Sequence, residues 1–446
     1  MQYIADLHIH SKYSRATSRD LTLPNIEKWC KIKGVDIIAT GDFTHPDWFK
    51  DISEQLEPAE EGLYKLKKTH PLPLSRGEIS WFNEKRPVRF LLSTEISLIY
   101  TKNDKCRRLH LLIFAPSIEA VNKIIVHLEK IGNLHSDGRP ILGLDAEELA
   151  KIVLDKSDKC MIIPAHAWTP WFAVFGSKSG FDSLEECFGE MTKHIYAIET
   201  GLSSDPAMNW QLSQLNNITL ISNSDAHSPS NIAREANIFD FASLSYDEIY
   251  NTIKNKDAKK FLKTIEFFPE EGKYHFDGHR DCNISFTPEE TKKHHGICPV
   301  CKKPLTLGVA YRVNILADRH PETKQCPPVK LSAVSSPQVC VTSIPFIHLV
   351  GLEKIIAESK GIGVKSKAVQ SEYKNLIKNF GAELNILMNV PIEEFKSKNI
   401  NDKITEGIRR VRAKNLHIKP GYDGVYGKVK IFNKNASKGK NQIHLL

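Results

Sequence analysis

Short apolar runs alternate with longer amphipathic stretches through the first 266 residues of this 446-residue chain. The apolar runs have the length and β-branched composition of strands, and most end at Gly, Pro, Asp or Ser. Seven strands are predicted, at Gln2–His8, Val35–Thr40, Arg89–Ile99, Leu109–Ala115, Lys159–Ala165, His194–Thr200 and Asn217–Ser222. Helices are predicted at Leu23–Lys33, Ile118–Ile131, Asp145–Leu154 and Asp205–Leu215, with a closing helix at Tyr246–Glu266. The alternation predicts an α/β fold with a largely parallel sheet.

One connection differs from the others. The stretch Tyr100–Arg108 is too short for a helical crossover, which needs about a dozen residues. A hairpin centred near Lys102 and Asn103 is therefore expected, and it would place Glu95 and His110 opposite each other. Residues 50–88 form a long charged insertion that we expect to cover one edge of the site.

Residues suited to metal binding follow the predicted strands in seven places. They are the pair His8 and His10, the segment Asp42–His45, Glu95, His110, His166, Glu199, and the pair Asp225 and His227. Because α/β barrels carry their chemistry at the carboxyl ends of their strands, this series predicts a closed seven-stranded barrel. Residues two apart on a strand point the same way, so His8 and His10 face one site.

The residue types indicate a site for two or more metal ions. Paired imidazoles suit zinc, manganese or iron, and Glu95 and Asp225 can each bridge two ions about 3.5–4 Å apart. Such a site favours phosphoester hydrolysis by metal-activated water, with Asp225, His227, Glu95 and Asp42 as the expected catalytic residues. The alternative for any single histidine is a structural hydrogen bond. It explains the whole set poorly, since so much buried charge is unfavourable.

Five segments resemble motifs of the PHP (polymerase and histidinol phosphatase) superfamily: Asp6–Ser11, Thr94–Ile96, His110–Leu112, Pro164–His166 and Ser224–His227. The resemblance implies a distorted seven-stranded barrel that holds two or three divalent ions (Zn, Mn, Mg or Fe) and hydrolyses phosphoesters. The expected ligands are His8, His10, Asp42, His45, Glu95, His110, His166, Asp225 and His227.

The chain departs from that superfamily in two places. Thr40-Gly41-Asp42 stands where Thr-Asp-His is usual, so Asp42 is assigned the ligand place and His45 is kept as a candidate. Ala16 and Thr17 stand where an acid or a histidine is common. The third metal is therefore expected to be held less firmly.

A second metal site is predicted after residue 266, where the sequence becomes rich in His, Cys, Gly and Pro. Two tight-turn pairs, His279 with Cys282 and Cys298 with Cys301, have the spacing of one tetrahedral structural zinc. Other candidates for the histidine place are His275, His294 and His295. The alternative is that the two pairs arise by chance.

Charge is distributed unevenly along the chain. Residues 267–446 carry 29 Lys and Arg against 17 Asp and Glu, whereas the first 266 residues carry 32 against 36. A balance of +12 over the second half favours a polyanion-binding surface, although Lys-rich helices can also be simple solvated faces.

Five further segments resemble the endonuclease Q family: Gly41–Pro46, His70–Glu78, Tyr274–Arg280, Leu305–Val313 and Gly407–Arg412. The resemblance extends over nearly the whole chain. It implies a DNA repair endonuclease that cuts 5′ to a deaminated base (uracil, hypoxanthine or xanthine) or an abasic site, leaving 3′-hydroxyl and 5′-phosphate ends. Two alternatives are a PHP-type phosphatase acting on a small phosphomonoester such as histidinol phosphate, and a non-catalytic DNA-binding subunit with a relic barrel.

Candidate DNA contacts fall into three groups. They are Lys12, Tyr13 and Arg15 after the first ligand pair; Trp168, Trp171 and Phe172 in the loop after His166; and Arg409, Arg410 and Arg412 in a basic helical run. The aromatic side chains suit base stacking or duplex wedging, with a hydrophobic lid as the alternative. The basic residues suit phosphate contacts, with a solvated helix face as the alternative.

The predicted organisation is a catalytic barrel at 1–266, a zinc-finger-like module at 267–330, a basic helical DNA-binding domain at 331–432 and a flexible tail at 433–446. In the tail, Gln442, Leu445 and Leu446 resemble a bacterial sliding-clamp peptide, although so short a match can arise by chance. Nine cysteines without regular spacing, and no signal-peptide or membrane pattern, lead us to expect a soluble cytoplasmic protein.

Overall fold

The computed structural model describes residues 1–68, 87–319 and 343–432. Residues 69–86 of the expected insertion at 50–88, which include the segment His70–Glu78, and the tail residues Gln442, Leu445 and Leu446 lie outside these ranges.

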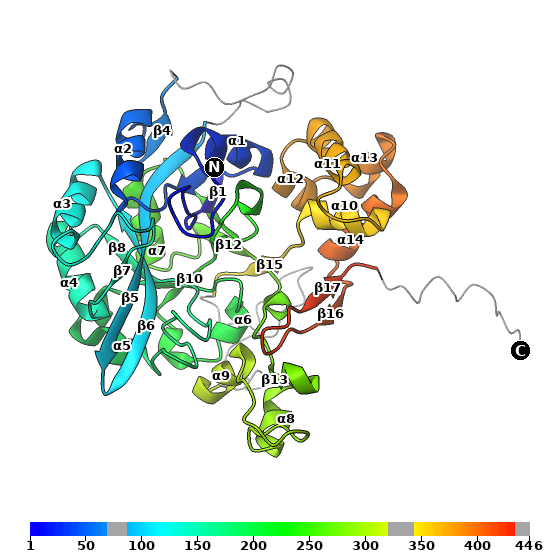
Figure 1. Cartoon of the computed structure of the whole chain (residues 1–446). Helices are drawn as coiled ribbons and strands as arrows, with labels where there is room; N and C mark the ends of the chain where they lie inside the picture. The colour runs from blue at the N-terminus through cyan, green and yellow to red at the C-terminus, as the bar shows by residue number, and fades with distance from the viewer. Residues whose placement is uncertain (69–86, 320–342, 433–446) are drawn as a thin grey trace, which may run out of the picture.

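A large mixed sheet runs through the N-terminal half (Figure 1). Its main path is β15-β12-β11-β1-β2-β5-β4-β3, with β6 and β7 also paired to β5 and with β8 paired to β6. The strands are β1 (Gln2–Asp6), β2 (Ile37–Ala39), β3 (Leu56–Pro58), β4 (Tyr64–Leu66), β5 (Arg89–Lys102), β6 (Lys105–Ala115), β7 (Ile141–Leu142), β8 (Met161–Pro164), β11 (Ala236–Asp240), β12 (Phe261–Glu266) and β15 (Phe346–His348). A separate parallel pair consists of β9 (Ala197–Glu199) and β10 (Thr219–Ile221). A strand lies within or over each of the seven predicted stretches.

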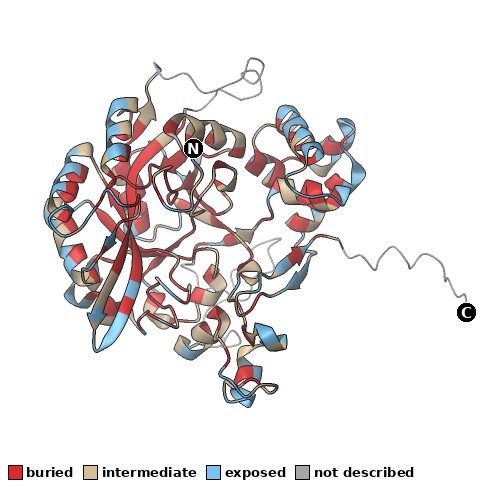
Figure 2. Cartoon of the chain, viewed as in Figure 1, coloured by how far each residue is buried: buried red, intermediate tan, exposed pale blue. Residues whose placement is uncertain are grey.

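Amphipathic helices cover the outside of these strands. They are α1 (Leu23–Lys33), α2 (Pro46–Gln55), α3 (Ile118–Leu128), α4 (Ala146–Lys156), α5 (Leu184–Phe188), α6 (Pro206–Asn209) and α7 (Tyr246–Lys254). Figure 2 shows their buried residues facing the strands and their exposed residues facing outward. Side chains of Ser117, Asp145 and Ser245 cap α3, α4 and α7 by accepting backbone N–H bonds. In the described ranges, no helix has both the length and the hydropathy to cross a membrane.

The hairpin predicted between the third and fourth strands is confirmed. β5 and β6 pair along their length down to Lys102 and Lys105, and the two turn residues, Asn103 and Asp104, have φ of 54° and 56°. Two consecutive left-handed residues form the turn whose twist matches that of the strands. Glu95 pairs with Leu112 rather than with His110, so the two candidate ligands are diagonal neighbours on the hairpin.

The predicted closing helix Tyr246–Glu266 is wrong in its second half. Helix α7 ends at Lys254, and Lys256 (φ 51°) turns the chain into β12, which pairs with β11 and β15. The short apolar run in β12 does not distinguish strand from helix by itself, because its pairing partners are distant in sequence. The predicted helix Asp205–Leu215 is only α6 followed by a 3₁₀ turn at Ser213–Leu215.

Two smaller parts follow the large sheet. The first contains the antiparallel pair β13 (Asp277–His279) and β14 (Ile284–Phe286) with α8 (Pro288–Lys293) and α9 (Val309–Leu316). The second contains α10 (Leu352–Lys360), α11 (Lys367–Phe380), α12 (Glu383–Met388), α13 (Ile392–Ser397) and α14 (Asp402–Arg412). The final pair, β16 (His417–Lys419) and β17 (Lys428–Lys430), lies between these two parts (Figure 1).

The helical part is docked against α1, beside the large sheet, by a buried ion pair. Lys33 at the end of α1 lies 2.6 Å from Glu383 of α12, which also accepts a hydrogen bond from Tyr373. Both partners of the ion pair are buried, so removing either would leave an uncompensated charge. β15 adds a second connection because it pairs in parallel with β12 of the large sheet.

Two buried glutamates lie together near this connection. Burial raises the pKa of Glu266 to about 8, although hydrogen bonds from Thr264 and Thr200 oppose the shift. Burial and the neighbouring Glu266 also raise the pKa of Glu235, and one of its carboxyl oxygens has no hydrogen-bond partner among the described residues. We therefore expect at least one of these carboxyl groups to be protonated near neutral pH.

This pair predicts a pH-dependent stability. A folded-state pKa of about 8 for Glu266, against an ordinary value of 4.5, means that the unfolded chain binds fewer protons between these pH values. The free energy of unfolding should therefore fall as pH rises through this window. Glu266→Gln, which removes the ionisation, should stabilise the protein at pH 8 and do so less at pH 5, as measured by thermal unfolding. The exposed control Glu54→Gln should leave the pH profile unchanged; a profile that Glu266→Gln does not alter would contradict the prediction.

Candidate metal centre

Most of the predicted ligands converge at one rim of the sheet. His8 and His10 follow β1, His166 follows β8, and Asp225 follows β10, while Glu95 and His110 lie within the β5–β6 hairpin. The Ile9–Ala226 bridge brings the segments after β1 and β10 side by side. His8, His10, His166 and Asp225 therefore meet because strand ends meet, as the sequence pattern predicts, whereas Glu95 and His110 reach the same rim from the middle of β5 and β6.

Their ligand atoms form three adjoining groups, each within 4.8 Å. The groups are His8, His10 and Glu95; His10, Asp225 and His227; and Glu95, His110 and His166. The shared residues are Glu95 and His10. One Glu95 oxygen lies 3.3 Å from His10 Nε2, and the other lies 3.0 Å from His110 Nδ1 and 3.1 Å from His166 Nε2. A single carboxylate thus contacts donors from two groups, as a bridging ligand does.

His8 provides a test of whether this donor set fits metal ions. Its Nε2 is buried and has no hydrogen-bond partner among the described residues, although it lies 3.6 Å from Asp225 and 3.8 Å from Glu95. Its Nδ1 lies 3.0 Å from Glu199. A histidine that is fixed through one ring nitrogen and unpaired at the other is suited to bind a metal through the second. The residues present fit a divalent cation.

Glu199 fixes more than one ligand. Besides facing His8, it accepts hydrogen bonds from the backbone N–H of His166 at 2.8 Å and from the Asn223 side chain at 2.9 Å. It is completely buried. The structure therefore places Glu199 behind the ligands, as a partner that orients them.

Asp42 and His45 do not join the three groups. Asp42 lies 3.0 Å from His10 Nδ1, on the side of the ring away from Glu95 and Asp225, and accepts bonds from the Ser11 N–H and the Ser14 hydroxyl. His45 instead stacks on Tyr13, with ring centroids 4.5 Å apart. Both residues were predicted to be metal ligands. In the structure, Asp42 instead supports the ligand His10, and His45 packs against the Tyr13 ring.

The backbone at the centre is strained. Asp42, His166 and Asp225 have φ of 48°, 31° and 46°, a region that non-glycine residues seldom occupy. Gly41 also has a positive φ, and a Cβ there would lie 2.3 Å from the Ile9 carbonyl oxygen. Such conformations persist where the surroundings enforce them, and they aim these side chains at the centre.

Charge at the centre is balanced by one residue that the sequence analysis missed. Burial opposes ionisation of Glu95, but His110, Arg139 and His8 hold its pKa well below the ordinary value. The Arg139 guanidinium lies 3.0 Å from Glu95. Burial lowers the pKa of His110 to about 4, so this imidazole is neutral, the form that binds metals. Arg139 lies in a loop after α3 with no motif around it, so no sequence signal identified it.

One side of the centre is open to solvent. The side chains of His227, Asp225 and Arg139 are 31%, 24% and 25% exposed, whereas His8, His10 and Glu95 are buried. A substrate phosphate would therefore approach from the side of Asp225, His227 and Arg139.

The aromatic residues after His166 divide between core and surface. Trp168 is buried, donates to Asn209 and packs on Phe175, so it does not lie at a binding surface. Phe172 packs on the His110 ring with centroids 4.7 Å apart, and Trp171 is 39% exposed. Only Trp171 and Phe172 of this predicted group lie where substrate could reach them.

The predicted basic contacts are mostly engaged within the protein. Lys12 is ion-paired with Asp51, and Tyr13 is stacked on His45. Arg15 is ion-paired with Asp137, although its side chain is 75% exposed. Arg409 and Arg410 bind Glu406. Arg412 donates to the carbonyls of Ile386 and Leu387 at the end of α12, a common role for arginine at a helix C-terminus.

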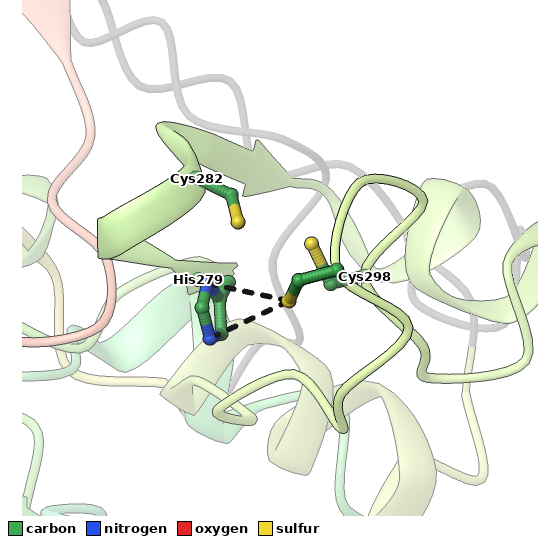
Figure 3. Close-up of side chains that lie close together, drawn as sticks. His279, Cys282 and Cys298 are labelled. Carbon is green, nitrogen blue, oxygen red and sulfur yellow. Dashed lines mark hydrogen bonds between the residues drawn. The ribbon is translucent and has the colours of Figure 1, made fainter.

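The second predicted metal site is assembled. Ligand atoms of His279, Cys282, Cys298 and Cys301 lie within 4.8 Å of one another, and Figure 3 shows the three labelled side chains pointing toward a common point. His275 is buried elsewhere, and His294 stacks on Phe286, so neither joins the group. Three thiols and one imidazole suit a closed tetrahedral zinc site.

Comparison with known proteins agrees with this geometry. Residues 351–415 match the family model of the MJ0043 C-terminal domain. The uncharacterized protein MJ0043 of Methanocaldococcus jannaschii is 30% identical over 59% of this chain, which spans only 31% of that protein. The uncharacterized protein YqxK of Bacillus subtilis is 28% identical over 96% of this chain and 98% of its own length.

Two solved structures match over nearly their full length. The lesion-specific endonuclease PfuEndoQ from Pyrococcus furiosus has a TM-score of 0.79 and 29% identity, covering all of both chains. An endonuclease Q in complex with a 27-mer duplex that has an abasic lesion at the active site has a TM-score of 0.78 and 30% identity. That match covers 97% of this chain and 98% of the other.

The fold and the two clusters define a mixed α/β protein with a buried histidine–carboxylate centre for divalent metals and a separate cysteine–histidine metal site. The endonuclease Q in the DNA complex is 30% identical to this chain over nearly the full length of both proteins, which identifies the family within this class. The chain belongs to the endonuclease Q family, which confirms the resemblance that its motifs suggested.

Replacing the orienting carboxylate should weaken metal binding. Glu199→Gln removes the charge that faces His8 Nδ1, and substitutions of such supporting residues typically weaken metal affinity by about 10–100-fold. A Mn²⁺ titration followed by electron paramagnetic resonance measures the change without involving the thiol site. The exposed control Glu190→Gln should bind Mn²⁺ like the wild type; equal affinity in the two variants would show that Glu199 does not act through the ligands.

The thiol site should hold one zinc ion per chain. Cys298→Ser should lose about one equivalent of zinc by mass spectrometry and lower the melting temperature, since small modules of this kind depend on the metal for folding. Cys106→Ser, at an exposed cysteine outside the cluster, is the matched control and should retain the zinc. Zinc retained by Cys298→Ser would exclude this residue as a ligand.

Proposed function

We propose that this protein is a metal-dependent DNA repair endonuclease that hydrolyses the phosphodiester 5′ to a deaminated base (uracil, hypoxanthine or xanthine) or an abasic site. The observation that carries the proposal is the buried centre of His8, His10, Glu95, His110, His166, Asp225 and His227 in a member of the endonuclease Q family. The lesion types and the position of the cut come from the family resemblance.

The residues have distinct tasks in this proposal. Two or three divalent ions (Zn, Mn, Mg or Fe) would be held by the three ligand groups, with Glu95 and His10 serving two groups each. When bound, they would lower the pKa of water and neutralise charge on the phosphate. Glu199 and Asp42 orient His8 and His10 through their Nδ1 atoms. Arg139, partly exposed beside Glu95, is placed to contact a phosphate oxygen on the open side.

A distorted seven-stranded barrel of the PHP type is part of the proposal. Its supports are the backbone bond from Ala167 N–H to the Glu199 carbonyl, which links the ends of β8 and β9, and the Ile9–Ala226 bridge. These contacts join the separate β9–β10 pair to the large sheet on both sides.

The remaining assignments rest on the sequence. The boundaries at 266, 330 and 432, one structural zinc held by His279, Cys282, Cys298 and Cys301, and a cytoplasmic location stay part of the proposal. The proposal also includes binding of a sliding clamp through Gln442, Leu445 and Leu446.

A phosphatase acting on a small phosphomonoester explains less of the chain. Such a substrate needs only the metal centre, whereas the chain also has a cysteine–histidine module and a helical part docked by Lys33 and Glu383. A non-catalytic subunit fits poorly, because the ligands are intact and the strained backbone at Asp42, His166 and Asp225 is retained.

A nicking assay tests the proposed function. With Mn²⁺, Mg²⁺ or Zn²⁺, the protein should nick a labelled duplex with one uracil, hypoxanthine or abasic site on the 5′ side of the lesion. Asp225→Asn should lower the rate by at least about 10³-fold, because it removes a charged ligand from the open group. The exposed control Asp104→Asn, in the β5–β6 turn, should keep wild-type activity. Equal cutting of undamaged duplex, or release of phosphate from histidinol phosphate without nicking, would refute the proposal.

A further inference from the structure

The two short strands near the C-terminus present a row of basic side chains. β16 and β17 are antiparallel, with His417 opposite Lys430 and Lys419 opposite Lys428. Because alternate residues of a strand share a face, these four side chains, the basic ribbon face, lie on one side. All four residues are exposed. The central residue of β17, Val429, points the other way and is buried, whereas its cross-strand partner Ile418 is 41% exposed, so the ribbon is anchored through β17.

This arrangement is unfavourable without a partner. Like charges directly opposite on neighbouring strands destabilise the pair, and here Lys419 faces Lys428. In the ranges 1–68, 87–319 and 343–432, no carboxylate forms an ion pair with Lys419, Lys428 or Lys430. The arginines of α14, by contrast, are held by Glu406 and by backbone carbonyls. Unlike Arg409 and Arg410 of α14, the three ribbon lysines therefore have no ion-pair partner in the described part of the chain.

The turn that joins the two strands packs on the cysteine–histidine module and on the residues just before its first ligand, His279. Gly421 accepts a hydrogen bond from the Phe276 N–H, and Asp423 accepts one from the Arg280 N–H. At its tip, Tyr426 is 65% exposed and lies under the Lys273 ammonium, 4.6 Å from the ring centroid. An exposed aromatic ring and a cation therefore continue the basic ribbon face along the surface.

From this turn the surface continues to the metal centre. Tyr274, next to Lys273, contacts the exposed Trp171, with ring centroids 5.6 Å apart. Trp171 is followed by Phe172, which packs on the ligand His110. Two ring contacts, one cation–ring contact and the chain between them thus link the ribbon turn to Phe172 beside the ligand His110.

We propose that the basic ribbon face binds the phosphate backbone of duplex DNA beside the cut site. A two-stranded ribbon has dimensions that suit a DNA groove and its flanking phosphates, and lysines bind phosphate as flexible point charges. Continuity with the metal centre favours the same duplex that the centre cuts over an unrelated polyanion. The inference rests on the proposed function and adds a contact surface that lies outside the basic helical run.

Removing the ribbon charges tests this surface. The triple variant Lys419→Gln, Lys428→Gln, Lys430→Gln should bind undamaged duplex at least about tenfold more weakly near 0.1 M salt. Its slope of log affinity against log salt should be smaller by about two to three, one unit for each lost phosphate contact. The matched control, Lys123→Gln, Lys130→Gln, Lys193→Gln, removes the same charge from exposed positions on the barrel side. An unchanged slope, or an equal loss of affinity in the control, would overturn the proposal.

A charge reversal separates binding from structure. Lys428→Glu places an acid opposite Lys419, so the cross-strand repulsion becomes an attraction. The expected result is a melting temperature at or above that of the wild type together with weaker DNA binding. A lower melting temperature, or binding like the wild type, would overturn the proposal.

The DNA-binding role of the ribbon and the proposed nuclease function can be tested independently of each other. Binding of undamaged duplex requires no cleavage, so it tests the ribbon even if no lesion is cut. Nicking of a lesion-containing duplex by the wild-type protein tests the proposed function alone.

Discussion

The buried carboxylate of Glu95 is the interaction on which the centre depends. It contacts His10, His110 and His166 and is balanced by Arg139, while almost none of its surface reaches solvent. An ionised carboxylate in such a place is stable only when it is fully paired. The position of Glu95 is fixed because it lies on β5, which pairs with β2, β4, β6 and β7. The most extensively paired strand therefore carries the charge that most needs a fixed environment.

The supporting residues explain why the ligands are held in one arrangement. Glu199 fixes His8, and Asp42 fixes His10, each through the ring nitrogen that faces away from the other ligands. Left-handed backbone at Asp42, His166 and Asp225 adds a conformational penalty of roughly 1–3 kcal/mol each, which the rest of the fold must offset. The centre is thus pre-organised at the expense of local stability.

Much of the fold and of the centre could be predicted because both follow local patterns. Seven of the strands, the β5–β6 hairpin and the ligands at strand ends were visible in periodicity and in loop length. What could not be predicted depends on contacts distant in sequence. Arg139 has no motif, β12 is defined by its pairing with β11 and β15, and Trp168 is buried through Asn209. Ligand type was visible in the sequence, whereas ligand orientation was not: Asp42, predicted as a metal ligand, faces His10 Nδ1, while Glu95 and Asp225 face Nε2.

The path of the chain after the large sheet has a consequence for how its parts can be separated. The chain leaves the sheet through β15, forms α10 to α14, and then returns through the β16–β17 turn to residues before the cysteine–histidine module. There Gly421 and Gly427 donate backbone bonds to Glu270 and Glu271. The cysteine–histidine module is therefore held both by its covalent connection to the large sheet and by these backbone contacts with the β16–β17 turn. These contacts lie after α14, so shortening the chain from its C-terminal end would remove them before it removes any helix.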